Sequence, residues 1–220
     1  MADNVYEILE AAIPSYRKYI DIPVCDNGEP MVELPLDGQI RGRQFDFGSR
    51  ELTDGVVEVR ADVRNRLWIA AEFLVSLDAG FSLEVGYGYR PLEVQRRKYD
   101  EQLVRLSNEY DDEQKLCDAA HRFVAIPQAA GHPTGGAVDI SIYREDVELD
   151  FGTSRWELEK DSYTFSPYIS ESALRNRMLL RETMVRAGFA PYGGEWWHFS
   201  YGDKEWAYVT KSPTARYDQL

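Results

Sequence analysis

Two short segments constrain the fold of this chain more than any other feature. They are residues 131–139 (GHPTGGAVD) and 194–198 (GEWWH), and they contain two of the three histidines and one acidic residue each. Imidazole and carboxylate groups are ligands that divalent transition metals take from proteins. If the two segments share one cation, the fold must bring these distant parts of the chain to a single point.

The residue types divide naturally into ligands and a proton carrier. A catalytic zinc takes three protein ligands and keeps its fourth position open for water. We predict that His132, Asp139 and His198 bind one zinc ion, which leaves Glu195 free to act as general base. Either histidine alone is more often a packed core residue, but the pair with its acidic neighbours favours a metal site. His121 belongs to neither of these two segments, and we assign it to the surface or to a helix end.

The first segment continues into a predicted strand over residues 136–143. Apolar side chains alternate onto one face of this strand: Val138, Ile140 and Ile142. Asp139 therefore projects from the opposite face. His132 precedes the strand by a turn rich in proline and glycine, and Gly135 and Gly136 permit the close backbone approach that folds it back over Asp139.

The second segment lies in a predicted hairpin of residues 189–192 and 196–201, joined across two glycines. Aromatic residues of its second strand alternate onto the core face: Trp197, Phe199 and Tyr201. His198 then faces away from the core. Glu195 lies three residues before His198, so a regular strand would point the two in opposite directions. We expect a bend or bulge at the glycines to bring them together.

The remaining pattern predicts an α+β fold, in which helices pack on a small, mostly antiparallel sheet with an irregular N-terminal arm. The expected elements are helices over residues 57–79, 91–106, 111–121 and 172–188 and a strand over residues 81–87. Prolines and glycines recur in residues 1–55, which we interpret as an arm or subdomain with short strands at best, packed on a main domain of residues 56–220.

Composition and charge exclude several classes of partner. A chain of 220 residues that is 44% hydrophobic can bury a sizeable core. Its net charge of −13 repels phosphate backbones and anionic lipid, so we expect neither a nucleic-acid nor a membrane partner. The first residues lack the basic and apolar regions of a secretion signal, which predicts a cytoplasmic protein. The oligomeric state is left open.

At the two segments the chain resembles the zinc D-alanyl-D-alanine dipeptidases associated with vancomycin resistance, within a wider D-Ala-D-Ala metallopeptidase family. The family pattern is Ser-x-His-x-x-Gly-x-Ala-x-Asp, followed downstream by Glu-x-x-His. Its positions are matched by His132, Gly135, Ala137, Asp139, Glu195 and His198. The Trp-Trp filling of the second element resembles the dipeptidase branch and makes Trp197 a candidate for substrate contact. The resemblance covers roughly residues 81–206.

This resemblance implies a role for each matched residue. Zinc is held by His132, Asp139 and His198, and Glu195 is the general base. The segment YGYRP, which contains Arg90, resembles a Tyr-Arg-Pro element whose arginine polarises the scissile carbonyl. A guanidinium stays charged and offers forked donors to a developing oxyanion, which suits this role. The implied substrate is a small free dipeptide, D-Ala-D-Ala above all.

Two departures from the family pattern leave the substrate open. Ala130 stands where the family has a serine. An element resembling Gly-Thr-Pro-Phe-Asp appears as residues 152–157 (GTSRWE), longer by one residue. Glu157 is the candidate that pairs with a substrate ammonium, and Asp150 competes for that role.

Three alternatives therefore stand beside the dipeptidase. The first is a D-Ala-D-Ala carboxypeptidase or peptidoglycan endopeptidase of the same family. The second is a non-catalytic binding module that zinc only braces, although such bracing has no use for Glu195. The third is a biosynthetic enzyme that acts on an amide other than a dipeptide.

Overall fold

The structure is a computed structural model that describes residues 2–44, 55–157 and 159–220. The helices are α1 (Ala2–Ala12), α3 (Ala61–Leu77), α4 (Leu92–Leu106), α5 (Glu113–His121), α6 (Glu171–Arg186) and α7 (Lys204–Thr210). The strands are β1 (Met31–Glu33), β2 (Ile40–Gly42), β3 (Glu58–Arg60), β4 (Phe81–Tyr87), β5 (Ala137–Arg144), β6 (Val147–Glu148), β7 (Ala190–Pro191) and β8 (His198–Ser200). No helix of the described residues has the length and apolarity needed to cross a bilayer.

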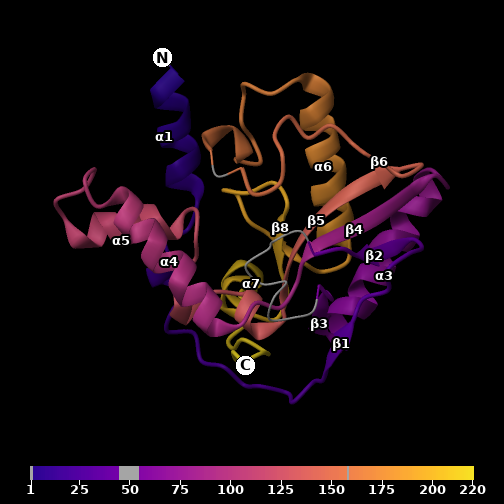
Figure 1. Ribbon diagram of the computed structural model, residues 1–220, viewed down its shortest axis with the longest axis horizontal. Coiled ribbons are helices and arrows are strands. Elements are labelled where there is room, and N and C mark those ends of the chain that lie inside the picture. Colours follow the sequence, from indigo (N-terminus) through magenta and orange to yellow (C-terminus); the bar gives the residue numbers. More distant parts are fainter. Residues whose placement is uncertain (1, 45–54, 158) are drawn as a thin grey trace.

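A six-stranded sheet forms the centre of the molecule (Figure 1). Its main path runs β2-β4-β5-β8-β7, and β6 pairs with the far end of β5. β2 and β4 are parallel, whereas the other neighbours are antiparallel. The predicted α+β fold with a small, mostly antiparallel sheet is confirmed.

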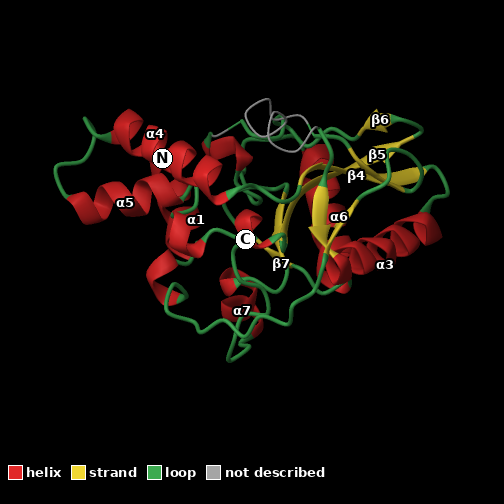
Figure 2. Ribbon diagram, turned by 60° about the horizontal axis from the view of Figure 1, so that its bottom comes forward, coloured by secondary structure: helices red, strands yellow, loops and turns green. Residues whose placement is uncertain are grey.

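Helices α3 and α6 pack together against the sheet, and α4 and α5 form a separate pair beside it (Figure 2). The main core joins the sheet to α3 and α6. Fully buried residues of these helices in the core include Leu67, Leu74, Leu180 and Met184. A smaller cluster around Tyr99 and Leu106 holds α4 against α5. Residues of α4, of the end of α5 and of the two histidine-bearing segments line one cavity.

The N-terminal arm departs from its prediction. The expectation of short strands at best is wrong for residues 2–12, which form α1. The segment contains three alanines and two glutamates, which favour helix, and the first proline comes only at Pro14. β2 also joins the main sheet. Residues 45–54 lie outside the described part, and the division at residue 55 stays a prediction.

Of the two predicted alternatives for His121, the helix end is confirmed, since the residue ends α5, and the surface position is excluded. Its side chain is 5% exposed. Nδ1 accepts a hydrogen bond from the backbone N–H of Ile126 at 3.0 Å, which leaves the proton on Nε2, 2.8 Å from the Tyr19 hydroxyl. The neutral ring therefore ties the arm to the end of α5.

This burial makes stability depend on pH. Burial lowers the pKa of His121 to about 4 from its usual 6.5. Between pH 6.5 and pH 4 the unfolded chain binds a proton at His121 that the folded protein does not bind. The contribution of neutral His121 to the free energy of unfolding is therefore complete above pH 6.5, and about 3 kcal/mol of it is lost as the pH falls towards 4. Urea unfolding of the wild type and His121→Gln should show a stability difference that shrinks over this window. A difference independent of pH would contradict the assignment.

Candidate active site

The register of β5 against β8 brings two of the predicted ligands together. Asp139 stands directly opposite His198 in this antiparallel pair, and Tyr87 of β4 flanks Asp139 on its other side. Facing residues of adjacent strands have neighbouring side chains. Nδ1 of His198 lies 3.0 Å from Oδ1 of Asp139. Sheet pairing alone thus positions one imidazole and one carboxylate.

The third predicted ligand comes from the turn before β5. His132 begins a short 3-10 helix (His132–Thr134), and its Nε2 lies 3.4 Å from Oδ1 of Asp139. Its Nδ1–H donates a hydrogen bond to the carbonyl oxygen of Gly88 at 2.8 Å, which leaves Nε2 with a free lone pair. The predicted role of the glycines holds: Gly135 has a φ of 72°, and a Cβ on Gly136 would lie 2.3 Å from a backbone oxygen.

These three side chains fit a single divalent metal ion. One ligand atom of each lies within 4.8 Å of the others. Burial lowers the pKa of His132 to about 4, so this imidazole is neutral. Burial opposes ionisation of Asp139, but the two histidines outweigh it and hold the pKa of Asp139 well below its usual value. Two imidazoles and one carboxylate are a ligand set typical of zinc with an open position.

Glu195 and His198 converge through a tight turn. The backbone N–H of His198 donates to the carbonyl oxygen of Glu195 at 3.3 Å, and Trp196 and Trp197 form the turn between them. The predicted bend therefore exists: the chain bends at Gly193 and Gly194, and a turn at Trp196 and Trp197 follows it. Burial raises the pKa of Glu195 to about 8. A carboxyl group with such a pKa exchanges a proton readily near neutral pH.

Arg90 follows β4 by three residues and lines the same cavity as Glu195 and His198. Its backbone N–H donates to the carbonyl oxygen of His132 at 3.2 Å, and its guanidinium lies 4.3 Å over the ring of Tyr87. Nη1 donates to Gln95 at 2.8 Å. The buried Nε–H has no hydrogen-bond partner among the described residues. A fixed guanidinium thus keeps one donor available to a ligand.

These groups line one cavity with a volume of about 210 Å³. The predicted residues that line it are Arg90, His132, Asp139, Glu195 and His198. Ala130 also lines it, as do Tyr19 of the N-terminal arm, Arg122 and Glu205. The arm therefore contributes directly to the wall.

Two predicted substrate contacts lie elsewhere. Trp197 is 1% exposed and belongs to the main core, so it does not line the cavity. Glu157 is exposed, accepts a hydrogen bond from the backbone N–H of Ser154 at 3.0 Å, and faces a separate surface pocket together with Asp150. The structure places neither residue in the cavity that the three predicted ligands line.

Trp156, which the sequence analysis did not identify, lines the cavity instead. Its Nε1–H donates to Oδ2 of Asp139 at 2.9 Å. The indole fits because Gly86 of β4 has no side chain: a Cβ there would lie 2.8 Å from the ring. Trp156 therefore orients the carboxylate whose other oxygen meets the two imidazoles.

Trp156→Phe should weaken metal binding roughly 10- to 100-fold, because groups that orient metal ligands have effects of this size. The variant keeps an aromatic ring but loses the N–H donor together with the five-membered ring that carries it, and the control below makes the same change in size. Competition with a chelator of known zinc affinity measures the change. Trp68→Phe, on the exposed face of α3, is the control. Unchanged zinc affinity in Trp156→Phe would show that Asp139 does not depend on this hydrogen bond.

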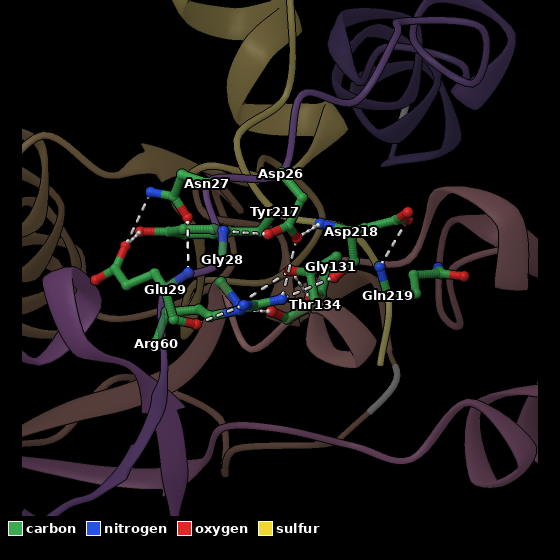
Figure 3. Close-up of polar contacts among 11 residues, drawn as sticks. Asp26, Asn27, Gly28, Glu29, Arg60, Gly131, Thr134, Tyr217, Asp218 and Gln219 are labelled. Atoms are coloured by element: carbon green, nitrogen blue, oxygen red, sulfur yellow. Dashed lines mark hydrogen bonds and ion pairs between the residues drawn. The ribbon is translucent and has the colours of Figure 1, made fainter.

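A polar network fixes the turn that carries His132 (Figure 3). Arg60, which is 3% exposed, donates from Nε to the carbonyl oxygen of Thr134 at 2.8 Å. Its Nη atoms donate to the carbonyl oxygens of Glu29 at 2.6 Å and Asp218 at 3.1 Å. One buried guanidinium thereby joins the arm, the C-terminal residues and the turn that carries His132.

A buried ligand triad beside a carboxylate that can move a proton is the arrangement of a metallopeptidase. Comparison with known proteins agrees. The model of the family described as D-ala-D-ala dipeptidase matches residues 61–216, and the chain belongs to this family of metallopeptidase enzymes.

Individual relatives carry the same description. The chain is 28% identical to a D-alanyl-D-alanine dipeptidase of Synechocystis sp., over 87% of this chain and 90% of that protein. It is 26% identical to a D-alanyl-D-alanine dipeptidase of Escherichia coli, over 60% and 61% of the two chains. Among solved structures, the LdcB LD-carboxypeptidase is similar with a TM-score of 0.47 and 21% identity, covering 84% of this chain and 74% of that chain.

Proposed function

We propose that this metallopeptidase is a zinc-dependent dipeptidase that hydrolyses D-Ala-D-Ala or a similar small dipeptide. One observation carries the proposal: His132, Asp139 and His198 present their ligand atoms to one point of a cavity that Glu195 also lines. The description shared by the family model and the relatives supports the choice of substrate.

The chain's own residues supply the proton transfers and part of the charge stabilisation. A bound zinc acts as a Lewis acid that polarises the carbonyl and lowers the pKa of water. Glu195 accepts the proton of the attacking water and delivers it to the leaving amine. The free Nε–H of Arg90 stabilises the negative charge that develops on the carbonyl oxygen. Trp156 keeps Asp139 oriented throughout.

The size and charge of the cavity support a small zwitterionic substrate. Its volume of about 210 Å³ is below the roughly 300–1,000 Å³ of drug-sized ligand sites. Arg122 lines it with a buried Nε–H that has no hydrogen-bond partner among the described residues, so a donor is ready for a substrate carboxylate. These features favour a free dipeptide over a longer stem peptide.

A panel of substrates tests the proposal. Zinc-loaded protein is given D-Ala-D-Ala, L-Ala-D-Ala, L-Ala-L-Ala, N-acetyl-D-Ala-D-Ala and a stem pentapeptide ending in D-Ala-D-Ala. We expect the free D,D-dipeptide to have the highest kcat/KM. Preferred cleavage of the pentapeptide would favour the carboxypeptidase or endopeptidase alternative. Zinc binding without hydrolysis of any peptide would leave the braced module or a biosynthetic enzyme.

A further inference from the structure

Glu205 is an acidic residue of the cavity that the proposed mechanism does not use. Of the described residues, three acidic ones line the cavity: Asp139, Glu195 and Glu205. The first suits a metal ligand and the second a general base. No lysine or arginine of the described residues forms an ion pair with Glu205, and its neighbour Lys204 points to the carbonyl oxygen of Ile20 instead. The carboxylate of Glu205 therefore lines the cavity without a lysine or arginine of the described residues as its ion-pair partner.

Glu205 is half-buried in the first turn of α7. This burial raises the pKa of its carboxyl group to about 7, because the cavity wall solvates a carboxylate less well than water does. The start of α7 does not need it, because Asp203 already caps the helix by accepting from the backbone N–H of Trp206 at 2.8 Å. A half-buried charge without an ion-pair partner is stabilised when a ligand supplies the opposite charge. A cationic group that enters the cavity meets this condition.

Its position suits one cation in particular. The ammonium nitrogen of a dipeptide is two bonds from the scissile carbonyl carbon, so its partner must stand close to the groups that attack that carbon. Glu205 lines the same cavity as Glu195 and His198. Tyr19 and Tyr192 also line this cavity. Glu205 thus lies within electrostatic reach of the proposed centre of reaction.

We propose that Glu205 is the carboxylate that binds the free ammonium group of the substrate and so selects dipeptides over N-blocked peptides. This inference rests on the proposed dipeptidase function. It replaces Glu157, which is exposed and faces a separate pocket in the structure. Asp150 faces that same pocket and accepts from the backbone N–H of Gly152 at 2.8 Å.

Two matched variants, Glu205→Gln and Glu157→Gln, are compared with the wild type on D-Ala-D-Ala and on N-acetyl-D-Ala-D-Ala. We expect Glu205→Gln to lower kcat/KM for the free dipeptide roughly 10- to 100-fold, mainly through a higher KM, because it loses a charged hydrogen bond to substrate. The acetylated compound lacks the ammonium, so its weaker turnover should barely change. Glu157→Gln should keep the preference of the wild type.

Glu205→Asp retains the charge and should retain much of the preference, which guards against a folding defect in Glu205→Gln; thermal unfolding checks both. If the wild type cleaves D-Ala-D-Ala and Glu205→Gln keeps the full preference for the free amine, the assignment of Glu205 is overturned and the dipeptidase function stands. Loss of the preference in Glu157→Gln also overturns it. A wild type that cleaves no dipeptide removes the proposed function and this inference together.

Discussion

Glu195→Gln is expected to lower the turnover of D-Ala-D-Ala roughly 1,000-fold while zinc content stays at the wild-type level. The amide keeps the size of the side chain but cannot accept the proton of the attacking water, and general acid–base catalysis contributes roughly 100- to 10,000-fold. Glu195 is not among the three side chains whose ligand atoms meet. Activity and metal binding should therefore separate in this variant.

The measurement is kcat with saturating dipeptide, together with zinc per protein from elemental analysis. Glu101→Gln, on the exposed face of α4, makes the same chemical change away from the cavity and should be fully active. Turnover within a few-fold of the wild type in Glu195→Gln would remove the general base from the proposal. Loss of zinc in this variant would instead make Glu195 a ligand.

Asp139→Ala should abolish activity by a different route, the loss of metal. It removes the one oxygen ligand and the group that both imidazoles contact, at 3.0 Å for His198 and 3.4 Å for His132. Metal catalysis is worth several kcal/mol, and about 1.4 kcal/mol is tenfold in rate, so activity should fall to less than roughly a thousandth. Elemental analysis after dialysis should find far less than one zinc per chain.

Circular dichroism and thermal unfolding check that Asp139→Ala still folds, because the change also leaves the Trp156 N–H without its acceptor. Asp100→Ala, exposed on α4, is the matched control and should retain both zinc and activity. If Asp139→Ala binds zinc as tightly as the wild type, the metal is held elsewhere.

The sequence predicted the ligand strands well because their side chains obey a simple alternation. The apolar stripe of β5 set the direction in which Asp139 projects, and the aromatic stripe of β8 did the same for His198. What alternation cannot supply is the register between two strands. Only the structure shows that Asp139 and His198 stand directly opposite one another.

Other features of the site depend on contacts that no local pattern records. Trp156 reaches Asp139 because its loop folds over Gly86, which belongs to a different strand. The same fold leaves Glu157 facing the solvent, although a matching motif made it the candidate. Burial of Trp197 follows from the very alternation that predicted a core position for it, and this pattern was a better guide than the family motif.

Helix α7 shows a signal that was present but not used. Asp203 precedes Lys204–Thr210 as a capping residue, a common mark of a helix start. Recognising it would have placed Glu205 in the first turn of a helix directly after β8. That the side chain lines the cavity is a result of tertiary packing and could not be read from spacing.

Titration of metal-free protein with zinc, while D-Ala-D-Ala hydrolysis is followed, tests the central claim most directly. A single catalytic ion held by His132, Asp139 and His198 predicts that activity rises from near zero and reaches its plateau at one zinc per chain. Full activity in protein shown to contain no metal, or a plateau reached only at two or more ions per chain, would contradict it.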